Sequence, residues 1–241
     1  ETPTTFKPRV KTTLHLLDAV QRVARGETTW FEYLYGVATG VGKTADFLFG
    51  CNTWREETGH NVHLLVTSMP DTRKDLCRDV RDGVPFQDFI VWAPDKHVDD
   101  LRYLLKDRVR PFSQIKDIDN MPNHQHVLSL GVQDARGNEG DKYKTILTKL
   151  KFGMYGKDEA HTNQSDYSLF AKNVEPKLDY GMAVYMTGTP EQFILEYSKF
   201  TEENRHLFLM AQVYEAKIDG DPDFIDVPWR NICVLDYAGA Q

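Results

Sequence analysis

Residues 38–44 read Ala-Thr-Gly-Val-Gly-Lys-Thr, and their neighbours restrict this part of the chain to one local fold. The aromatic and β-branched run at 30–37 is typical of a strand, and residues 45–50 resemble the start of a helix. Gly40 and Gly42 let the backbone curl tightly and turn its N–H groups inward. A loop of this kind at a helix N-terminus binds phosphate oxygens, so the segment predicts a nucleotide triphosphate site.

Each position of this loop has an expected role. Val41 lies between the two glycines, and Lys43 supplies a compact positive charge for the β- and γ-phosphates. Thr44 supplies a hydroxyl for Mg²⁺ at the start of the helix. Val37 stands where the full pattern has a further glycine. The alternative is a glycine-rich turn that ends in Gly-Lys-Thr by chance.

The size and composition of the chain fit one large α/β domain. It has 241 residues, of which 41% are hydrophobic and 27% are charged. No segment resembles a membrane span or a signal peptide. The three cysteines are far apart and odd in number, which favours a cytoplasmic or other intracellular location. The net charge of −7 gives no support for nucleic-acid binding, although a local basic patch can outweigh it.

Hydrophobic patterning predicts a mostly parallel sheet with helices on both faces, within one domain spanning residues 1–241. Strands are expected at 61–67, 89–92, 126–132, 182–187 and 206–213, and helices at 14–24, 71–80 and 98–109. A polar loop is expected at 113–125 and a turn at 137–141. Because the chain starts at Glu1 and stops just after a strand-like run at 231–235, we interpret it as a piece of a longer protein.

Two further motifs lie downstream. Lys-Asp-Glu-Ala-His at 157–161 offers adjacent carboxylates, of which Asp158 can hold a metal and Glu159 can polarise an attacking water. The alternative is a surface acidic pair, and the two glycines and the lysine before Asp158 are unusual for a buried strand. Thr-Gly-Thr-Pro at 187–190 offers two hydroxyls and a sharp turn, and its alternative is an ordinary β-turn.

Taken in order, Ala-Thr-Gly-Val-Gly-Lys-Thr, Asp-Glu-Ala-His and Thr-Gly-Thr-Pro resemble motifs I, II and III of superfamily 2 helicases and translocases. The resemblance runs from about Phe6 to Pro190. It implies a RecA-like P-loop NTPase domain that uses ATP and Mg²⁺, in which that form of the loop does not need the missing glycine. It also implies that Glu159 is the catalytic base and that His161, Thr187 and Thr189 couple the nucleotide to a nucleic acid.

The resemblance also implies partners. Thr67 and Ser68 stand where this family contacts a nucleic-acid backbone, and Gln133 ends a segment that often makes another such contact. The motif spellings are more similar to DNA motors, such as phage helicases and the motor subunits of restriction enzymes, than to DEAD-box RNA proteins. DEAH-type RNA helicases share the second motif, so RNA stays open. The second partner is another RecA-like domain of the same full-length protein.

Two departures from the family pattern affect the expected activity. Phe6-Lys-Pro-Arg9 resembles the segment that precedes an adenine-reading glutamine, and Arg9 is a candidate nucleotide contact, but the glutamine is absent. The motifs of a second domain, including its arginine finger, are also missing. Such a finger accelerates phosphoryl transfer by about 10³–10⁵-fold. We therefore expect weak ATP binding and slow hydrolysis from this piece alone.

Other candidate sites have simpler interpretations. His124 and His126 could bind a metal with His161, but a polar loop fits the spacing better. The cysteines and tryptophans are interpreted as packing residues rather than as thiol catalysts or base-stacking groups. Two classes of function therefore remain: an ATP-driven nucleic-acid motor, and a nucleotide-regulated binding or assembly module without motor activity.

Overall fold

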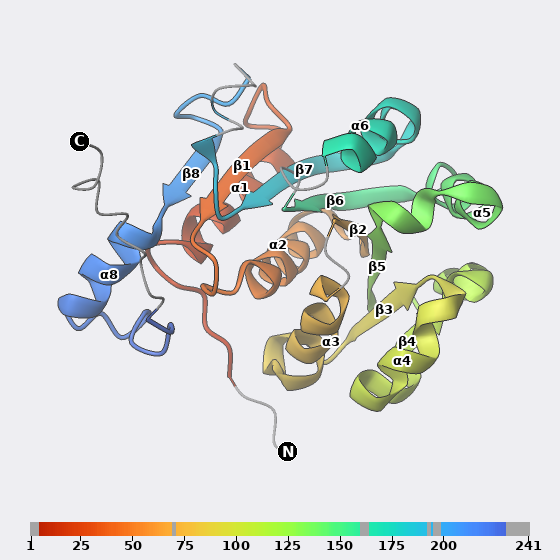
Figure 1. Ribbon diagram of the computed structural model, residues 1–241, viewed down its shortest axis with the longest axis horizontal. Coiled ribbons are helices and arrows are strands. Elements are labelled where there is room, and N and C mark those ends of the chain that lie inside the picture. Colours follow the sequence, from red (N-terminus) through yellow and green to blue (C-terminus); the bar gives the residue numbers. More distant parts are fainter. Residues whose placement is uncertain (1–4, 69–70, 160–163, 192–193, 195–198, 230–241) are drawn as a thin grey trace, which may run out of the picture.

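The computed structural model describes residues 5–68, 71–159, 164–191, 194 and 199–229. Its described strands form one sheet in which every pairing is parallel, in the order β4-β3-β5-β2-β6-β7-β1-β8 (Figure 1). The strands are β1 (Glu32–Val37), β2 (Val62–Thr67), β3 (Phe89–Ala93), β4 (Val109–Pro111), β5 (Gln125–Gly131), β6 (Lys151–Asp158), β7 (Asp179–Thr187) and β8 (Arg205–Phe208).

Helices connect these parallel strands. They are α1 (Thr13–Ala24), α2 (Lys43–Thr58), α3 (Thr72–Asp82), α4 (Asp95–Leu105), α5 (Gly137–Leu147), α6 (Gln164–Asn173) and α8 (Met210–Ile218). Short 3₁₀ helices include η3 (Phe112–Asn120), η4 (Val132–Ala135) and η5 (Glu175–Lys177). Among the described residues, no helix has the length and apolar character that a membrane crossing requires.

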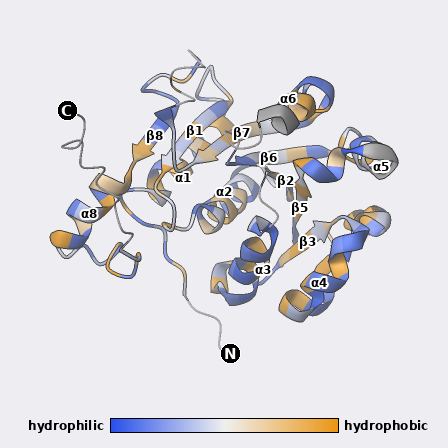
Figure 2. Cartoon of the chain, viewed as in Figure 1, coloured by the Kyte–Doolittle hydropathy of each residue, from blue (hydrophilic) through white to orange (hydrophobic). Residues whose placement is uncertain are grey.

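The sheet is buried on both faces, which confirms the predicted α/β class. Along β7, Met182 and Val184 join a core cluster with α1 to α4 and α8, while Ala183 and Tyr185 join a second cluster with η3, α5 and α6. This alternation is the period of two expected of a strand covered on both sides. The outer surface of α3 is polar instead, and the helix is mostly hydrophilic in colour in Figure 2.

The unusual composition of β6 has a packing reason. A Cβ on Gly153 would lie 2.4 Å from the Trp54 ring, and one on Gly156 would lie 2.7 Å from the Phe47 ring, so these glycines make room for α2. The buried Lys157 ammonium donates to both carboxylate oxygens of Glu175 in η5, at 2.9 and 3.0 Å. A paired lysine is tolerated in a core where an unpaired one is not.

Gly153→Ala is therefore expected to destabilise the fold. The added methyl group must displace Trp54, which is buried between α2 and the sheet, and overpacking of this kind costs about 1–3 kcal/mol. Chemical denaturation measures the loss. Combining the change with Trp54→Phe should recover part of it, and a full loss in the double variant would show that the ring is not the obstacle.

Two predicted boundaries at the edge of the sheet are wrong. The helix expected at 98–109 ends at Leu105, because Lys106 adopts a left-handed φ of 52°, and Val109 then begins β4. The polar loop expected at 113–125 is largely η3, with Phe112 and Ile118 buried, and Gln125 belongs to β5. A short amphipathic turn is hard to distinguish from a loop by composition alone.

Two further assignments were wrong in kind. The turn expected at 137–141 is the first part of α5, and Gly140 is needed there because a Cβ would lie 2.3 Å from the Ala135 carbonyl carbon. The strand expected at 206–213 ends at Phe208, where the Leu209 N–H donates to the Gln212 side chain and α8 begins. The run at 231–235 lies outside the described residues.

Candidate functional site

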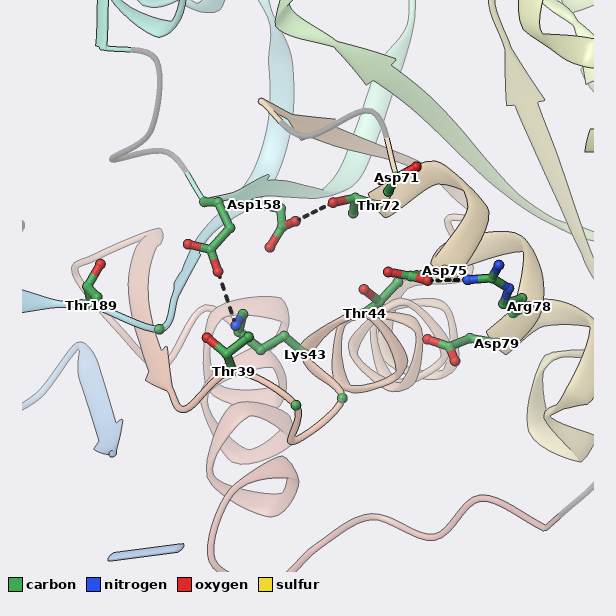
Figure 3. A pocket seen from close by; sticks show the side chains of 14 residues that line it. Thr39, Lys43, Thr44, Asp71, Thr72, Asp75, Arg78, Asp79, Asp158 and Thr189 are labelled. Carbon is green, nitrogen blue, oxygen red and sulfur yellow. Dashed lines mark hydrogen bonds and ion pairs between the residues drawn. The ribbon is translucent and has the colours of Figure 1, made fainter. Parts of the chain in front are cut away.

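The loop between β1 and α2 has the curled backbone that its glycines predict. Gly40 and Gly42 both have φ of 90°, a conformation that side chains disfavour, and Gly42 immediately precedes the first residue of α2, Lys43. The loop borders a cavity of about 600 Å³ (Figure 3). Its lining residues are Thr39, Gly40, Gly42, Lys43, Thr44, Asp71, Thr72, Asp75, Arg78, Asp79, Asp158, Glu159, Gly188 and Thr189.

The two carboxylates predicted at the end of β6 face the loop across this cavity. Lys43 Nζ lies 3.2 Å from Glu159 Oε1, and both side chains are largely buried. Asp158 accepts a hydrogen bond of 3.0 Å from the Thr72 hydroxyl (Figure 3). Glu159 has a left-handed φ of 49°, and its N–H donates to the Met186 carbonyl at 2.9 Å. The neighbouring strand β7 therefore holds the strained backbone of Glu159 in place.

The surroundings of Asp158 disfavour the ionised form of its carboxyl group. Burial, helped by the nearby Glu159 charge, raises the pKa of this carboxyl from 3.8 to about 6, against the attraction of Lys43. A divalent cation would stabilise the ionised form. Asp158 and Thr44 line one cavity, and a carboxylate with a hydroxyl is an oxygen donor set that suits Mg²⁺. These residues therefore fit the metal that the sequence predicts.

The third motif reaches the same cavity from β7. Gly188 lies against the loop so closely that a Cβ there would be 2.5 Å from Thr39 Oγ1. The Thr187 hydroxyl is buried and accepts the Thr189 N–H at 3.0 Å, while Thr189 lines the cavity. The structure thus brings together the segments near residues 40, 158 and 188. The close approach of Gly188 to Thr39 is a direct contact between the loop and the segment that carries Thr187 and Thr189.

The remaining predicted residues have different surroundings. Thr67 and Ser68 are buried beside the second motif, with Ser68 Oγ donating to the Glu159 carbonyl at 3.2 Å. Gln133 is exposed in η4, just after β5. Nucleic-acid contact by these three stays a prediction. His161 lies outside the described residues. Arg9 binds main-chain carbonyls of Val41 and Asp223 rather than lining the cavity.

The simpler interpretations fit the contacts of His126, Trp92 and two of the cysteines. Trp92 Nε1 donates to His126 Nδ1 at 3.1 Å, and His126 Nε2 lies 3.0 Å from the Met121 carbonyl, so both ring nitrogens are used within the fold. Cys51 and Cys77 are buried free thiols.

One wall of the cavity was not anticipated. The side of the cavity beside Thr44 is lined by α3 and by Asp71, the residue before that helix. The residues that line it are Asp71, Thr72, Asp75, Arg78 and Asp79. Burial, with the carboxylates around it, raises the pKa of Asp79 to about 7. The spacing of four residues places the three aspartates on one side of a helix, which is the signal that the sequence offers. A helix with so many charges is typical of a solvent-facing surface, so its composition alone does not predict that these carboxylates line the cavity.

A buried charge cluster lies beside Gln133. Asp134 accepts from Arg73 at 2.7 Å, from the Gly131 N–H at 3.1 Å and from Lys96 at 3.0 Å, and His97 Nε2 lies 2.9 Å away. Burial alone would raise the pKa of this carboxyl, but the His97 hydrogen bond and the Arg73 charge lower it to about 2. The cluster joins η4 to α3 and α4.

Asp134→Asn is expected to destabilise the protein by about 3 kcal/mol at neutral pH, because it leaves the buried Arg73 without a counter-charge. The native pKa lies below the reference value of 3.8, so the native state binds fewer protons than the unfolded state. Wild-type stability from this group is therefore complete above about pH 4 and falls toward pH 2. Denaturation across this pH range should show the free energies of unfolding of wild type and Asp134→Asn converging as the pH falls. A constant difference would contradict the charge-based explanation.

Comparison with solved structures finds proteins with a similar fold. No model of a known protein family matches the chain, and none of the curated proteins matches its sequence. A nuclease-deletion mutant of the Type ISP restriction-modification enzyme LlaGI, in complex with a DNA substrate mimic, has a TM-score of 0.58 at 17% identity over 89% of this chain. The Sulfolobus solfataricus SWI2/SNF2 ATPase core in complex with dsDNA has a TM-score of 0.51 at 15% identity over 80%.

These likenesses show the fold alone. The chain corresponds to 21% of the length of the first structure and 36% of the second. The RecA-like fold predicted from the motifs is confirmed.

Proposed function

We propose that this chain is the ATP-binding domain of a superfamily 2 nucleic-acid motor, of the kind that carries an Asp-Glu-Ala-His motif. One observation carries the proposal: the glycine loop, Lys43, Thr44, Asp158 and Glu159 meet in a single cavity. The motifs are far apart in sequence, and they meet at the carboxyl ends of β1 and β6, which β7 separates in the parallel sheet. Open α/β sheets bind ligands at this edge.

The residues have distinct roles in ATP hydrolysis. The loop amides and Lys43 would bind the phosphates, and Thr44 and Asp158 would hold Mg²⁺, which would neutralise charge on the phosphate oxygens. Glu159 accepts the proton of the attacking water. Lys43 is paired with Glu159 at 3.2 Å. An arriving phosphate competes for that lysine and releases the Glu159 carboxylate for the water.

The proposed polymer is DNA. The two solved structures described above were determined with DNA or a DNA mimic, and the motif spellings favour DNA motors. Thr187 and Thr189, with His161, would transmit the nucleotide state to the bound strand, and Gln133 is exposed for contact with its backbone. Backbone contacts carry no base sequence, so we propose binding without sequence preference. A second RecA-like domain would supply the arginine finger.

ATP hydrolysis with and without nucleic acid tests this function. Phosphate release by the chain is measured alone and with double-stranded DNA, single-stranded DNA or RNA. We expect slow Mg²⁺-dependent hydrolysis that DNA increases. Stimulation by RNA and not by DNA would show that RNA is the partner in place of DNA. Nucleotide binding without hydrolysis under any of these conditions would favour a regulatory module and contradict the motor.

A further inference from the structure

We propose that Arg9 is a positioning residue for the loop between β1 and α2. Arg9 holds the Val41 carbonyl outward, so that the Gly42 N–H points toward the phosphates. The inference rests on the proposed nucleotide site. It also gives a role to the turn after α8, which supports Arg9 from the far end of the described chain.

The first step is the contact between Arg9 and the loop. Arg9 Nη1 donates to the Val41 carbonyl oxygen, and the same guanidinium lies 3.5 Å from the position that a Cβ on Gly42 would take. In a trans peptide unit the C=O and the following N–H point in opposite directions. A cation bound to the Val41 carbonyl therefore fixes the direction of the Gly42 N–H. It also polarises that peptide, which strengthens the N–H as a donor.

The second step is that this peptide unit needs such a restraint. Glycine at both 40 and 42 gives the curled backbone little intrinsic preference for one orientation, because glycine populates positive and negative φ about equally. If the peptide between Val41 and Gly42 rotated, its carbonyl would face the anion in place of the N–H. The Val41 side chain is fully buried, so it anchors the residue but leaves the following peptide free to turn.

Arg9 is itself fixed from the inside of the fold. Its backbone N–H donates to the Thr13 hydroxyl at 2.9 Å, and that hydroxyl donates to the buried Asp46 carboxylate at 2.6 Å. Tyr35 of β1 donates to the other oxygen of Asp46 at 2.7 Å. Asp46 lies in the first turn of α2, directly after the loop. The network thus ties Arg9 to the two elements between which the loop is suspended.

The turn after α8 fixes Arg9 from the outside. Arg9 Nε donates to the Asp223 carbonyl at 2.8 Å, and the Asp223 carboxylate accepts the Val10 N–H at 2.9 Å. Beside them, Lys11 pairs with Asp221 at 2.9 Å. The turn is held in shape by Lys217 of α8, which donates to the Ile225 carbonyl at 2.9 Å. Arg9 therefore bridges the loop and this turn with two different nitrogens.

The test compares Arg9→Ala and Arg9→Lys with wild type by calorimetric titration of Mg·ATP and Mg·ADP. Loss of a charge-assisted restraint should weaken both affinities about 10-fold in Arg9→Ala, with unchanged stoichiometry. Arg9→Lys should recover only part, since one ammonium cannot reach both carbonyls as the planar fork does. Millimolar ethylguanidinium should restore binding to Arg9→Ala. Arg25→Ala is the control, because Arg25 forms an exposed pair with Glu57.

Hydrogen exchange in the free protein supplies a readout that does not depend on binding. Exchange of the loop amides at residues 40–43 should rise in Arg9→Ala and not in Arg25→Ala. Unchanged affinity and unchanged loop exchange would overturn the inference. A lower stoichiometry at unchanged affinity would also overturn it, because that result indicates partial unfolding. If wild type binds no nucleotide, the proposed function fails, whereas the exchange result still reports on the Arg9 restraint.

Discussion

Lys43→Ala is expected to abolish measurable binding of Mg·ATP. The Lys43 side chain is 9% exposed and lines the cavity, and its ammonium is paired with Glu159. Its removal leaves the phosphate charges facing Asp158 and Glu159 with no compensating cation from the loop. Truncating one partner of a buried charge pair costs about 2–5 kcal/mol, which corresponds to a loss of affinity of at least ~30-fold.

Isothermal titration measures this loss. Lys144→Ala is the matched control, because Lys144 pairs with Asp141 at 3.0 Å on the exposed side of α5 and is outside the cavity. Its affinity should equal that of wild type. Retention of ATP binding by Lys43→Ala at wild-type strength would show that nucleotide binds elsewhere, and the assignment of the loop would be wrong.

Glu159→Gln is expected to stop hydrolysis while binding survives. An amide keeps the size and direction of the side chain but cannot accept the proton of the attacking water, and the loss of such a base lowers rates by about 10²–10⁴-fold. Binding should be equal to or tighter than wild type, because the substitution also removes the carboxylate that competes with phosphate for Lys43.

Single-turnover phosphate release, compared with titration, separates the two effects for Glu159→Gln. Glu57→Gln is the control, since Glu57 pairs with Arg25 away from the cavity. Equal loss of binding and hydrolysis would mean that Glu159 has a structural role. An unchanged rate would remove it from the chemistry altogether.

Local chemistry made the centre of the site predictable from sequence. Glycines at 40 and 42, a lysine and a threonine at the start of a helix, and adjacent carboxylates at the end of a strand each have a narrow set of uses. The sheet followed from apolar runs between helical segments. The two glycines of β6 looked unsuitable for a strand until Trp54 and Phe47 were seen to pack against them.

Contacts between distant segments explain what sequence could not provide. Arg9 and Asp223 are 214 positions apart, and no local pattern joins them. The acidic residues of α3 have a surface-like composition, and only the turn of that helix toward the loop places Asp75 and Asp79 in the cavity. Helix starts at Gly137 and Met210 depend on a close backbone approach and on a capping side chain, which composition does not show.

Hydrogen–deuterium exchange during titration with Mg·ATP tests the central claim most directly. If the loop and the second motif form one nucleotide site, backbone amides at 40–46 and 157–159 should become protected together, at the same ligand concentration. Lys43→Ala should show neither change. Saturable ATP binding with protection elsewhere and none at these two segments would contradict the account.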